Sequence, residues 1–165
     1  MSEQVHTQLF ADDLTVGQTF GGEARAIGDD AFNAFARLTG DDHPIHYDDA
    51  FAAKTRFGKR PAHGLLLASM TALGATPMSR RIEHAMVALV EQAFRFLKPV
   101  FVGDTVTSRF QVAAIERKPG RKTALVRFNV SLLNGRGEAV LEGHHAYLLL
   151  CRPRADATPG RPDDA

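Results

Sequence analysis

Residues 63–75 read His63-Gly64-Leu65-Leu66-Leu67-Ala68-Ser69-Met70-Thr71-Ala72-Leu73-Gly74-Ala75, with no charged side chain on any face. Good helix formers run through this segment, and a helix that is apolar all round is buried within its protein. The segment is shorter than the roughly 18 apolar residues that a membrane-spanning helix needs. The rest of the chain must therefore wrap it.

Four strand-like segments follow the predicted helix, at residues 84–98, 104–117, 121–134 and 137–151. The third alternates apolar and polar side chains, which is typical of a sheet with one buried face. Asn134-Gly135 predicts a hairpin into the fourth, and residues 18–27 suit a further strand. We predict an α+β fold in which a long antiparallel sheet wraps a buried helix. An antiparallel sheet with helices on one face would give nearly the same pattern.

The region before the buried helix divides into a helix and a long excursion. Asp29 to Leu38 has the spacing of a short amphipathic helix, with Asp29 as its cap and Gly40 as its end. Residues 40–62 should run irregularly over the surface, because Pro44 blocks helix continuation, although Asp48 to Arg56 could form a short helix. Loops of this length are usually functional.

The chain length of 165 residues and an apolar content of 44% suit a single domain, which we place at residues 1–151. Residues 152–165, rich in Pro, Arg, Asp and Gly, should form a disordered tail. Twenty basic and nineteen acidic side chains form no block that suggests a nucleic-acid partner.

The cysteine content and the N-terminal residues indicate the cellular compartment. Cys151 is the lone cysteine, so neither an intramolecular disulfide nor a zinc ribbon can form. Residues 1–7 lack the pattern of a secretory signal, and no segment is apolar enough to span a bilayer. We expect a soluble cytoplasmic protein without a membrane partner.

The densest group of reactive side chains lies in the excursion, which reads Gly40-Asp41-Asp42-His43-Pro44-Ile45-His46-Tyr47-Asp48. A turn could fold Asp41 and His46 around one point, and a carboxylate and an imidazole can share acid-base work on a water. The commoner interpretation of such spacing is a capping carboxylate and exposed histidines. His43 and His63 could also join these two residues around a metal. No paired His-x3-His or cysteine partner supports this, so we expect no metal and no cofactor.

A second candidate site is Arg60-Pro61-Ala62-His63-Gly64, at the start of the buried helix. The first turn of a helix leaves backbone N–H groups without intrahelical partners. The N–H of Gly64 could stabilise an oxyanion that forms on a thioester carbonyl. Close packing of backbone against backbone explains this glycine equally well.

These two segments, with a third, resemble the MaoC-like dehydratases and (R)-specific enoyl-CoA hydratases. The matching blocks are residues 38–46, 60–66 and 94–104, and with their order they extend the likeness over residues 12–150. In the third block we expect Phe94 and Phe96 to face the core of the sheet. The resemblance implies the hot-dog fold, in which a long sheet wraps a central helix.

The resemblance also implies catalytic roles for Asp41 and His46, which would hold the reacting water, and for the Gly64 N–H, which would stabilise the enolate. We predict substrate contacts at neighbouring positions, namely His43, Pro44, Ile45 and His63. The commoner family pattern has Asn in place of His43, which leaves the catalytic pair intact and bears on substrate preference.

The reaction implied is reversible hydration of a trans-2-enoyl-CoA to an (R)-3-hydroxyacyl-CoA. Two alternatives stay open from the residues, a hot-dog acyl-CoA thioesterase and a non-catalytic acyl-CoA-binding protein. A short sheet curled around one helix leaves unpaired edge strands, which proteins cover or pair. Together with the resemblance, this predicts a homodimer or a multiple of dimers.

Overall fold

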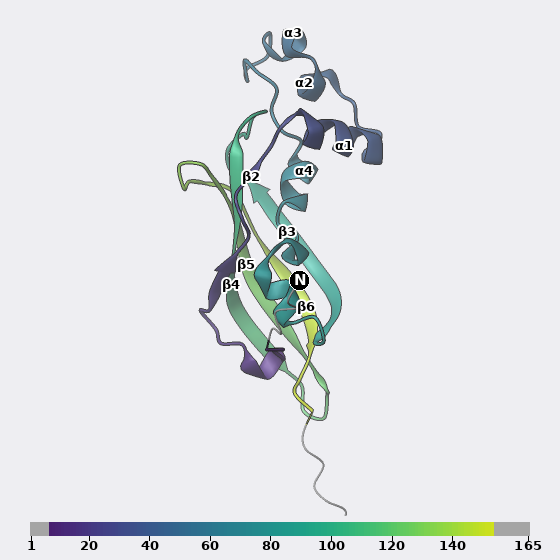
Figure 1. Cartoon of the computed structure of the whole chain (residues 1–165), viewed down its shortest axis with the longest axis vertical. Coiled ribbons are helices and arrows are strands. Elements are labelled where there is room, and N and C mark those ends of the chain that lie inside the picture. Colours follow the sequence, from purple (N-terminus) through teal and green to yellow (C-terminus); the bar gives the residue numbers. More distant parts are fainter. Residues whose placement is uncertain (1–6, 154–165) are drawn as a thin grey trace, which may run out of the picture.

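The computed structural model describes residues 7–153, and one antiparallel sheet dominates it (Figure 1). The strands, in chain order, are β1 Thr19–Gly21, β2 Arg25–Ala26, β3 Met86–Phe96, β4 Thr105–Arg117, β5 Thr123–Asn134 and β6 Ala139–Leu150. The helices are α1 Asp29–Thr39, α2 Pro44–Tyr47, α3 Asp49–Ala52, α4 Gly64–Ser69 and α5 Pro77–Arg81, with 3-10 turns η1 Ala11–Asp13 and η2 Leu73–Ala75.

The sheet has the order β1-β4-β5-β6-β3, with β2 also paired to β4. Every pairing is antiparallel, and the four long strands confirm the four predicted strand segments. The strand predicted at residues 18–27 exists as the two short strands β1 and β2. Along β5, buried residues from Ala124 to Leu132 alternate with exposed or partly exposed ones, as the sequence pattern predicts. The predicted α+β class with a long antiparallel sheet is therefore confirmed.

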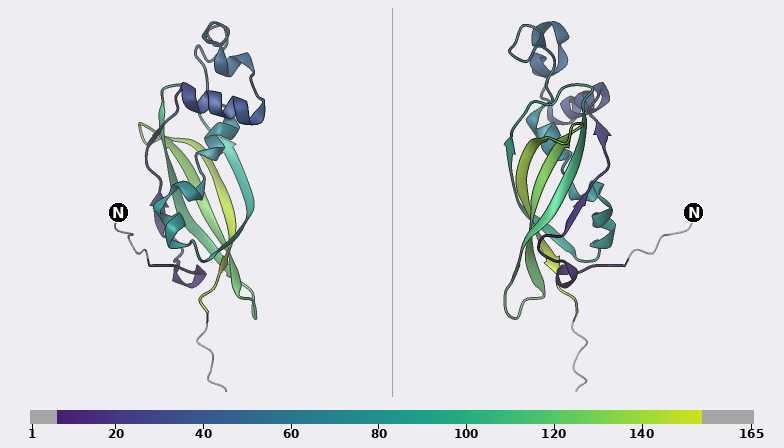
Figure 2. Two further views of the ribbon diagram at one scale, coloured as in Figure 1. Left: turned by 45° about the vertical axis from the view of Figure 1, so that its right-hand side comes forward. Right: turned by 90° about the vertical axis from the view of Figure 1, so that its left-hand side faces the viewer.

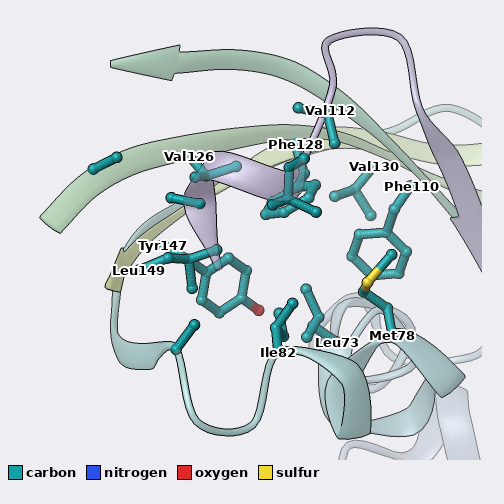
Figure 3. Close-up of a cluster of buried hydrophobic side chains, with 14 residues drawn as sticks. Leu73, Met78, Ile82, Phe110, Val112, Val126, Phe128, Val130, Tyr147 and Leu149 are labelled. Atoms are coloured by element: carbon teal, nitrogen blue, oxygen red, sulfur yellow. The ribbon is translucent and has the colours of Figure 1, made fainter. Parts of the chain in front are cut away.

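The helices are divided between one face and one end of the sheet. In Figure 2 the segment from α4 through α5 lies along one face, while α1, α2 and α3 gather beyond one end. One apolar cluster fills the space between the sheet, η2 and α5 and includes Phe110, Phe128 and Leu73 (Figure 3). A second, toward the α1 end, includes Phe32 and Leu66. The second cluster supports the elements that carry the candidate site.

The buried helix is shorter than predicted. It ends at Ser69, and the chain turns before η2 rather than continuing as one helix to Ala75. The Ser69 and Thr71 hydroxyls donate to the carbonyls three residues before them, and such bonds compete with helical hydrogen bonding. Leu66 is buried, whereas Leu65 is 63% exposed, so the prediction of burial on all sides was wrong.

Two further predictions need correction. Asp29 does not cap α1, because the capping position is Gly28 and Asp29 lies in the first turn, where it pairs with Arg60. Residues 40–62 contain α2 as well as α3, because a proline fits the first helical turn, where no intrahelical N–H bond is lost. Gly40, with φ of 74°, ends α1 as predicted.

Part of the predicted tail is described. Arg152 pairs with Asp13, and its backbone N–H donates to Asp12. The rest of the predicted disordered tail, residues 154–165, lies outside the described residues, as do residues 1–6. The single domain predicted for residues 1–151 stays a prediction.

Candidate active site

Asp41 follows the end of α1 and is held by the polypeptide on both sides of the turn. Its backbone N–H donates to the hydroxyl of Thr39 at 3.2 Å, and its Oδ1 accepts the backbone N–H of His43 at 3.3 Å. The second carboxylate oxygen, Oδ2, lies 2.6 Å from Nε2 of His63. The His43 N–H and, to a lesser degree, His63 lower the pKa of Asp41. The side chain is therefore a carboxylate that accepts hydrogen bonds.

His43 is the N-cap of α2, and its ψ of 128° lies in the range expected of a residue before proline. Its Nδ1 accepts the backbone N–H of Ile45 at 3.2 Å, so this imidazole caps the short helix. The ring is exposed and lies 5.9 Å from the ring of Phe51, centre to centre.

His46 lies in α2 and reaches toward the start of α4. Its Nδ1 is 2.8 Å from the carbonyl oxygen of Pro61. A carbonyl only accepts, so Nδ1 must carry the hydrogen of this bond. In the neutral ring, Nε2 therefore has a free lone pair and can act as a base.

Gly64 is the first residue of α4, directly after His63. Its backbone N–H has no hydrogen-bond acceptor within the part of the chain that the structure describes. A Cβ at this position would lie 3.1 Å from the ring of Phe96, which is closer than ordinary contact. Phe96 is 52% exposed, so the prediction that it faces the core was wrong, and its ring lies over Gly64 instead. The glycine allows this close approach.

A cavity of about 440 Å³ adjoins these groups. Its walls include three of the predicted site residues, Ile45, His46 and Gly64, together with Phe96. The remaining predicted residues, Asp41, His43, Pro44 and His63, are outside its lining. A larger cavity, of about 930 Å³ between α5 and β3, contains none of the predicted residues.

Asp41 and His46 both lie beside His63. The His46 and His63 rings are 5.1 Å apart, centre to centre, and Asp41 binds the Nε2 of His63. The direct side-chain partner of Asp41 is therefore His63. The roles predicted for all seven residues stay predictions, because position alone does not test them.

Sequence reasoning gave no role to three basic side chains near the candidate site. Arg60, with a side chain only 12% exposed, donates to Asp29 on α1 and to Asp49 on α3. These two ion pairs connect the excursion, residues 40–62, to α1. Arg56 and Lys98 line the cavity and supply two cations. Their sequence signal is weak, because single basic residues on loops are common.

No three His, Cys, Asp or Glu side chains between residues 7 and 153 are grouped as metal ligands. No helix in this range is both long and apolar enough to cross a bilayer.

The architecture is that of the hot-dog fold. A Mycobacterium tuberculosis protein with a double hot-dog fold superposes with a TM-score of 0.73 at 24% identity, over 93% of this chain and 47% of that one. An Archaeoglobus structure described as a monoamine oxidase regulatory protein gives a TM-score of 0.83 at 29% identity, covering 92% of this chain and all of that one.

Sequence comparison then defines the family. A model of the MaoC-like domain matches residues 12–134, and the chain belongs to this family. A 3-hydroxybutyryl-CoA dehydratase of Methylorubrum extorquens is 34% identical over 90% of this chain and 88% of its own length. An (R)-specific enoyl-CoA hydratase of Aeromonas caviae is 38% identical over 67% of this chain and 81% of its own length. These relatives are hydro-lyases, which confirms the predicted enzyme class.

Proposed function

We propose that the protein catalyses reversible hydration of a trans-2-enoyl-CoA to an (R)-3-hydroxyacyl-CoA. One observation carries this proposal. His46 is fixed through Nδ1 by the Pro61 carbonyl and lines the same cavity as Gly64, whose N–H has no acceptor among residues 7–153. A base and an oxyanion donor thus share one space, as addition of water to a conjugated thioester requires.

In this mechanism, Nε2 of His46 takes a proton from water as the water oxygen attacks C3 of the enoyl group. Electron density moves to the thioester oxygen, which the N–H of Gly64 stabilises. The protonated His46 then gives this proton to C2, which restores the neutral ring and yields the 3-hydroxyacyl thioester. Dehydration follows the same path in reverse. The contribution of α4 beyond this one N–H is small, because a six-residue helix has a weak dipole.

Asp41 holds the water against His46 in the proposed mechanism. Its lowered pKa keeps it ionised, and a carboxylate bound on each oxygen by one donor still has lone pairs for a water molecule. His43 and Pro44 are exposed and Ile45 lines the cavity, so we propose that these residues contact the substrate around the reacting carbons.

A direct assay tests the reaction. Purified protein is mixed with crotonyl-CoA and longer enoyl-CoAs, and the ultraviolet absorbance of the conjugated thioester is followed together with release of free thiol. Loss of absorbance without thiol release supports hydration. Thiol release indicates a thioesterase, and saturable binding with neither signal indicates an acyl-CoA-binding protein.

Variants assign the roles. Asp41→Asn and His46→Gln should each lower kcat by about 100- to 10,000-fold, the usual cost of losing an acid-base group. Asp30→Asn and His84→Gln are matched controls, because both residues are exposed and outside the cavity. Wild-type turnover in either folded site variant would contradict the assignment.

Two cations support a phosphate-bearing carrier. Arg56 and Lys98 line the cavity, and Lys98 pairs with Glu138 whereas Arg56 has no carboxylate partner among the described residues. Coenzyme A carries several phosphate charges that such side chains bind. We also propose a cytoplasmic location, since Cys151 is a free thiol suited to a reducing compartment.

We further infer that two copies pair through β3. This strand of 11 residues is an edge of the sheet, and nearly all of its residues are exposed. Its exposed apolar side chains include Val87, Leu89 and Val90, each 47–59% exposed. A long apolar edge is a template for pairing with another strand, and a second copy would complete it symmetrically.

Light scattering tests the assembly. Val90→Lys should shift the protein toward monomer, because it places a charge on the proposed interface. Val16→Lys is the matched control, since Val16 has the same exposure of 59% and lies away from β3. A wild-type protein that is monomeric and fully active at assay concentration would rule out this assembly.

A further inference from the structure

Both ring nitrogens of His63 are bound within the protein. Nδ1 accepts the backbone N–H of Leu65 at 3.1 Å and so caps α4. A nitrogen that accepts this bond carries no hydrogen. The hydrogen of the neutral ring is therefore on Nε2, which lies 2.6 Å from Oδ2 of Asp41 and donates to it.

The environment holds the ring in this orientation. Its centre is 4.8 Å from the ring of Phe35 on α1 and 5.1 Å from that of His46, and its side chain is 19% exposed. A doubly protonated ring has no acceptor, so the cap that the structure shows belongs to the neutral ring. Neither nitrogen is left for a substrate.

We propose that His63 is a positioning residue, which locks the Asp41 carboxylate relative to the oxyanion donor Gly64. The proposal rests on the proposed function and replaces the predicted substrate contact of His63 with an internal role. One imidazole joins the carboxylate, 22 residues earlier in the chain, to the first turn of α4.

The physical reason is that the reaction tolerates only a small displacement of the Asp41 carboxylate. A carboxylate that orients a water must be held within about 0.5 Å of its working position. The other bond to the Asp41 carboxylate, from the His43 N–H, is long at 3.3 Å and comes from within the same turn. His63 is thus the contact that ties this carboxylate to a different element.

Two substitutions separate the two bonds of His63. His63→Asn retains an acceptor near the position of Nδ1, and asparagine is a favoured N-cap, but its side chain is too short to reach Asp41. His63→Gln places an amide N–H near the position of Nε2 and gives up the cap. Both variants are compared with wild type by melting temperature, kcat, KM and the pH profile of kcat.

We expect His63→Asn to melt close to wild type, with kcat reduced about 10- to 100-fold, because small misplacements of catalytic groups cost rates of that order. The acidic limb of the kcat–pH profile of His63→Asn should move to higher pH, since Asp41 loses a hydrogen bond that lowers its pKa. His63→Gln should recover most of kcat and keep the limb in place, but melt earlier.

The reverse result, with a fully active His63→Asn and an impaired His63→Gln, would show that only the cap matters. Equal losses in both, with unmoved acidic limbs, would also overturn the proposal. Nitrogen-15 NMR of the wild-type histidines gives an answer even if neither variant folds, because His63 must be the Nε2–H tautomer and an Nδ1–H tautomer excludes the bond to Asp41. A wild type without hydratase activity refutes the proposed function, while the NMR result still stands.

Discussion

His145 on β6 should make the stability of this protein fall in mild acid. The residue is fully buried on the side of the sheet that faces the helices, among the rings of Phe94 and Phe110. The polar side chains in contact with the ring are neutral, namely the Thr71 hydroxyl at 3.3 Å from Nε2, the Tyr147 hydroxyl at 3.3 Å from Nδ1 and the Gln92 amide nitrogen at 3.2 Å from Nε2. No carboxylate contacts the ring among the described residues. Burial, with a small contribution from His144, lowers the pKa of His145 to about 4.

The sign and size of the effect follow from linkage. The unfolded chain binds a proton near the ordinary histidine pKa of 6.5, whereas the folded protein binds it only near pH 4. The neutral ring therefore supports folding above pH 6.5, and this contribution is lost as the pH falls toward 4. At about 1.36 kcal/mol per pH unit, the loss from pH 7 to pH 5 is at most about 2 kcal/mol. Below pH 4 it approaches about 3 kcal/mol.

Urea unfolding at pH 7, 6 and 5 measures this contribution. The free energy of unfolding of wild type should fall by about 2 kcal/mol more than that of His145→Gln over this range. The variant will be less stable at pH 7, because it loses buried contacts. The comparison therefore concerns only how steeply the free energy of unfolding changes with pH. His84→Gln, which removes an exposed histidine, should keep the wild-type slope. Parallel pH dependences of wild type and His145→Gln would refute the reasoning.

Three further predictions concern the site. Gly64→Ala should keep the melting temperature within a few degrees, because the exposed Phe96 ring can move by a few tenths of an ångström. It should lower kcat/KM by at least about 10-fold, because a methyl group enters the substrate cavity and weakens an oxyanion contact usually worth 100-fold or more; unchanged kinetics would contradict this. His43→Asn should change the ratio of kcat/KM between short and branched enoyl-CoAs more than the rate on the best substrate, since asparagine also caps α2. Equal loss on every substrate would make His43 catalytic. Arg56→Gln should raise KM for enoyl-CoA by about 1.5- to 5-fold at low salt, as expected of an exposed ion pair, and leave KM for an enoyl-pantetheine thioester unchanged. Lys54→Gln, outside the cavity lining, is the control, and equal effects on both thioesters would exclude a phosphate contact.

The strands could be predicted from sequence because their signals are local. The alternation in β5 depends on side chains two residues apart, and the turn at Asn134 on a short motif. The length of α4 was harder to predict. Its end depends on the Ser69 and Thr71 hydroxyls, which donate to backbone carbonyls. Whether such a hydroxyl binds the backbone or solvent depends on the tertiary packing around it.

The sequence nominates residues for the candidate site but not the bonds between them. The motif made Asp41 and His46 a candidate pair, yet spacing carries no information on which nitrogen of a histidine is protonated. Those hydrogens depend on Pro61 and Leu65, the first of which lies 15 residues from His46. The partnership of Asp41 with His63 likewise appears only when the excursion has folded back.

The bonds between the three sequence blocks explain why they occur together. His63 binds Asp41 and the Pro61 carbonyl binds His46, so the second block, residues 60–66, holds both candidate catalytic side chains of the first. The second block also binds the third, residues 94–104, since the Ala62 N–H donates to the Val100 carbonyl at 2.7 Å and Phe96 lies over Gly64.

The segment from Arg60 to Gly64 is therefore the common support of the proposed site. The ion pairs of Arg60 with Asp29 and Asp49, each at 2.8 Å, add two more attachments as charge-assisted hydrogen bonds. The first and third blocks are both bonded to residues 60–64 of the second, so we expect a change in this segment to move groups in both of the others. These bonds between the blocks explain why the three motifs occur together in one chain. Each motif is common alone, and together they line one cavity, to which the first block contributes His46 and the second Gly64.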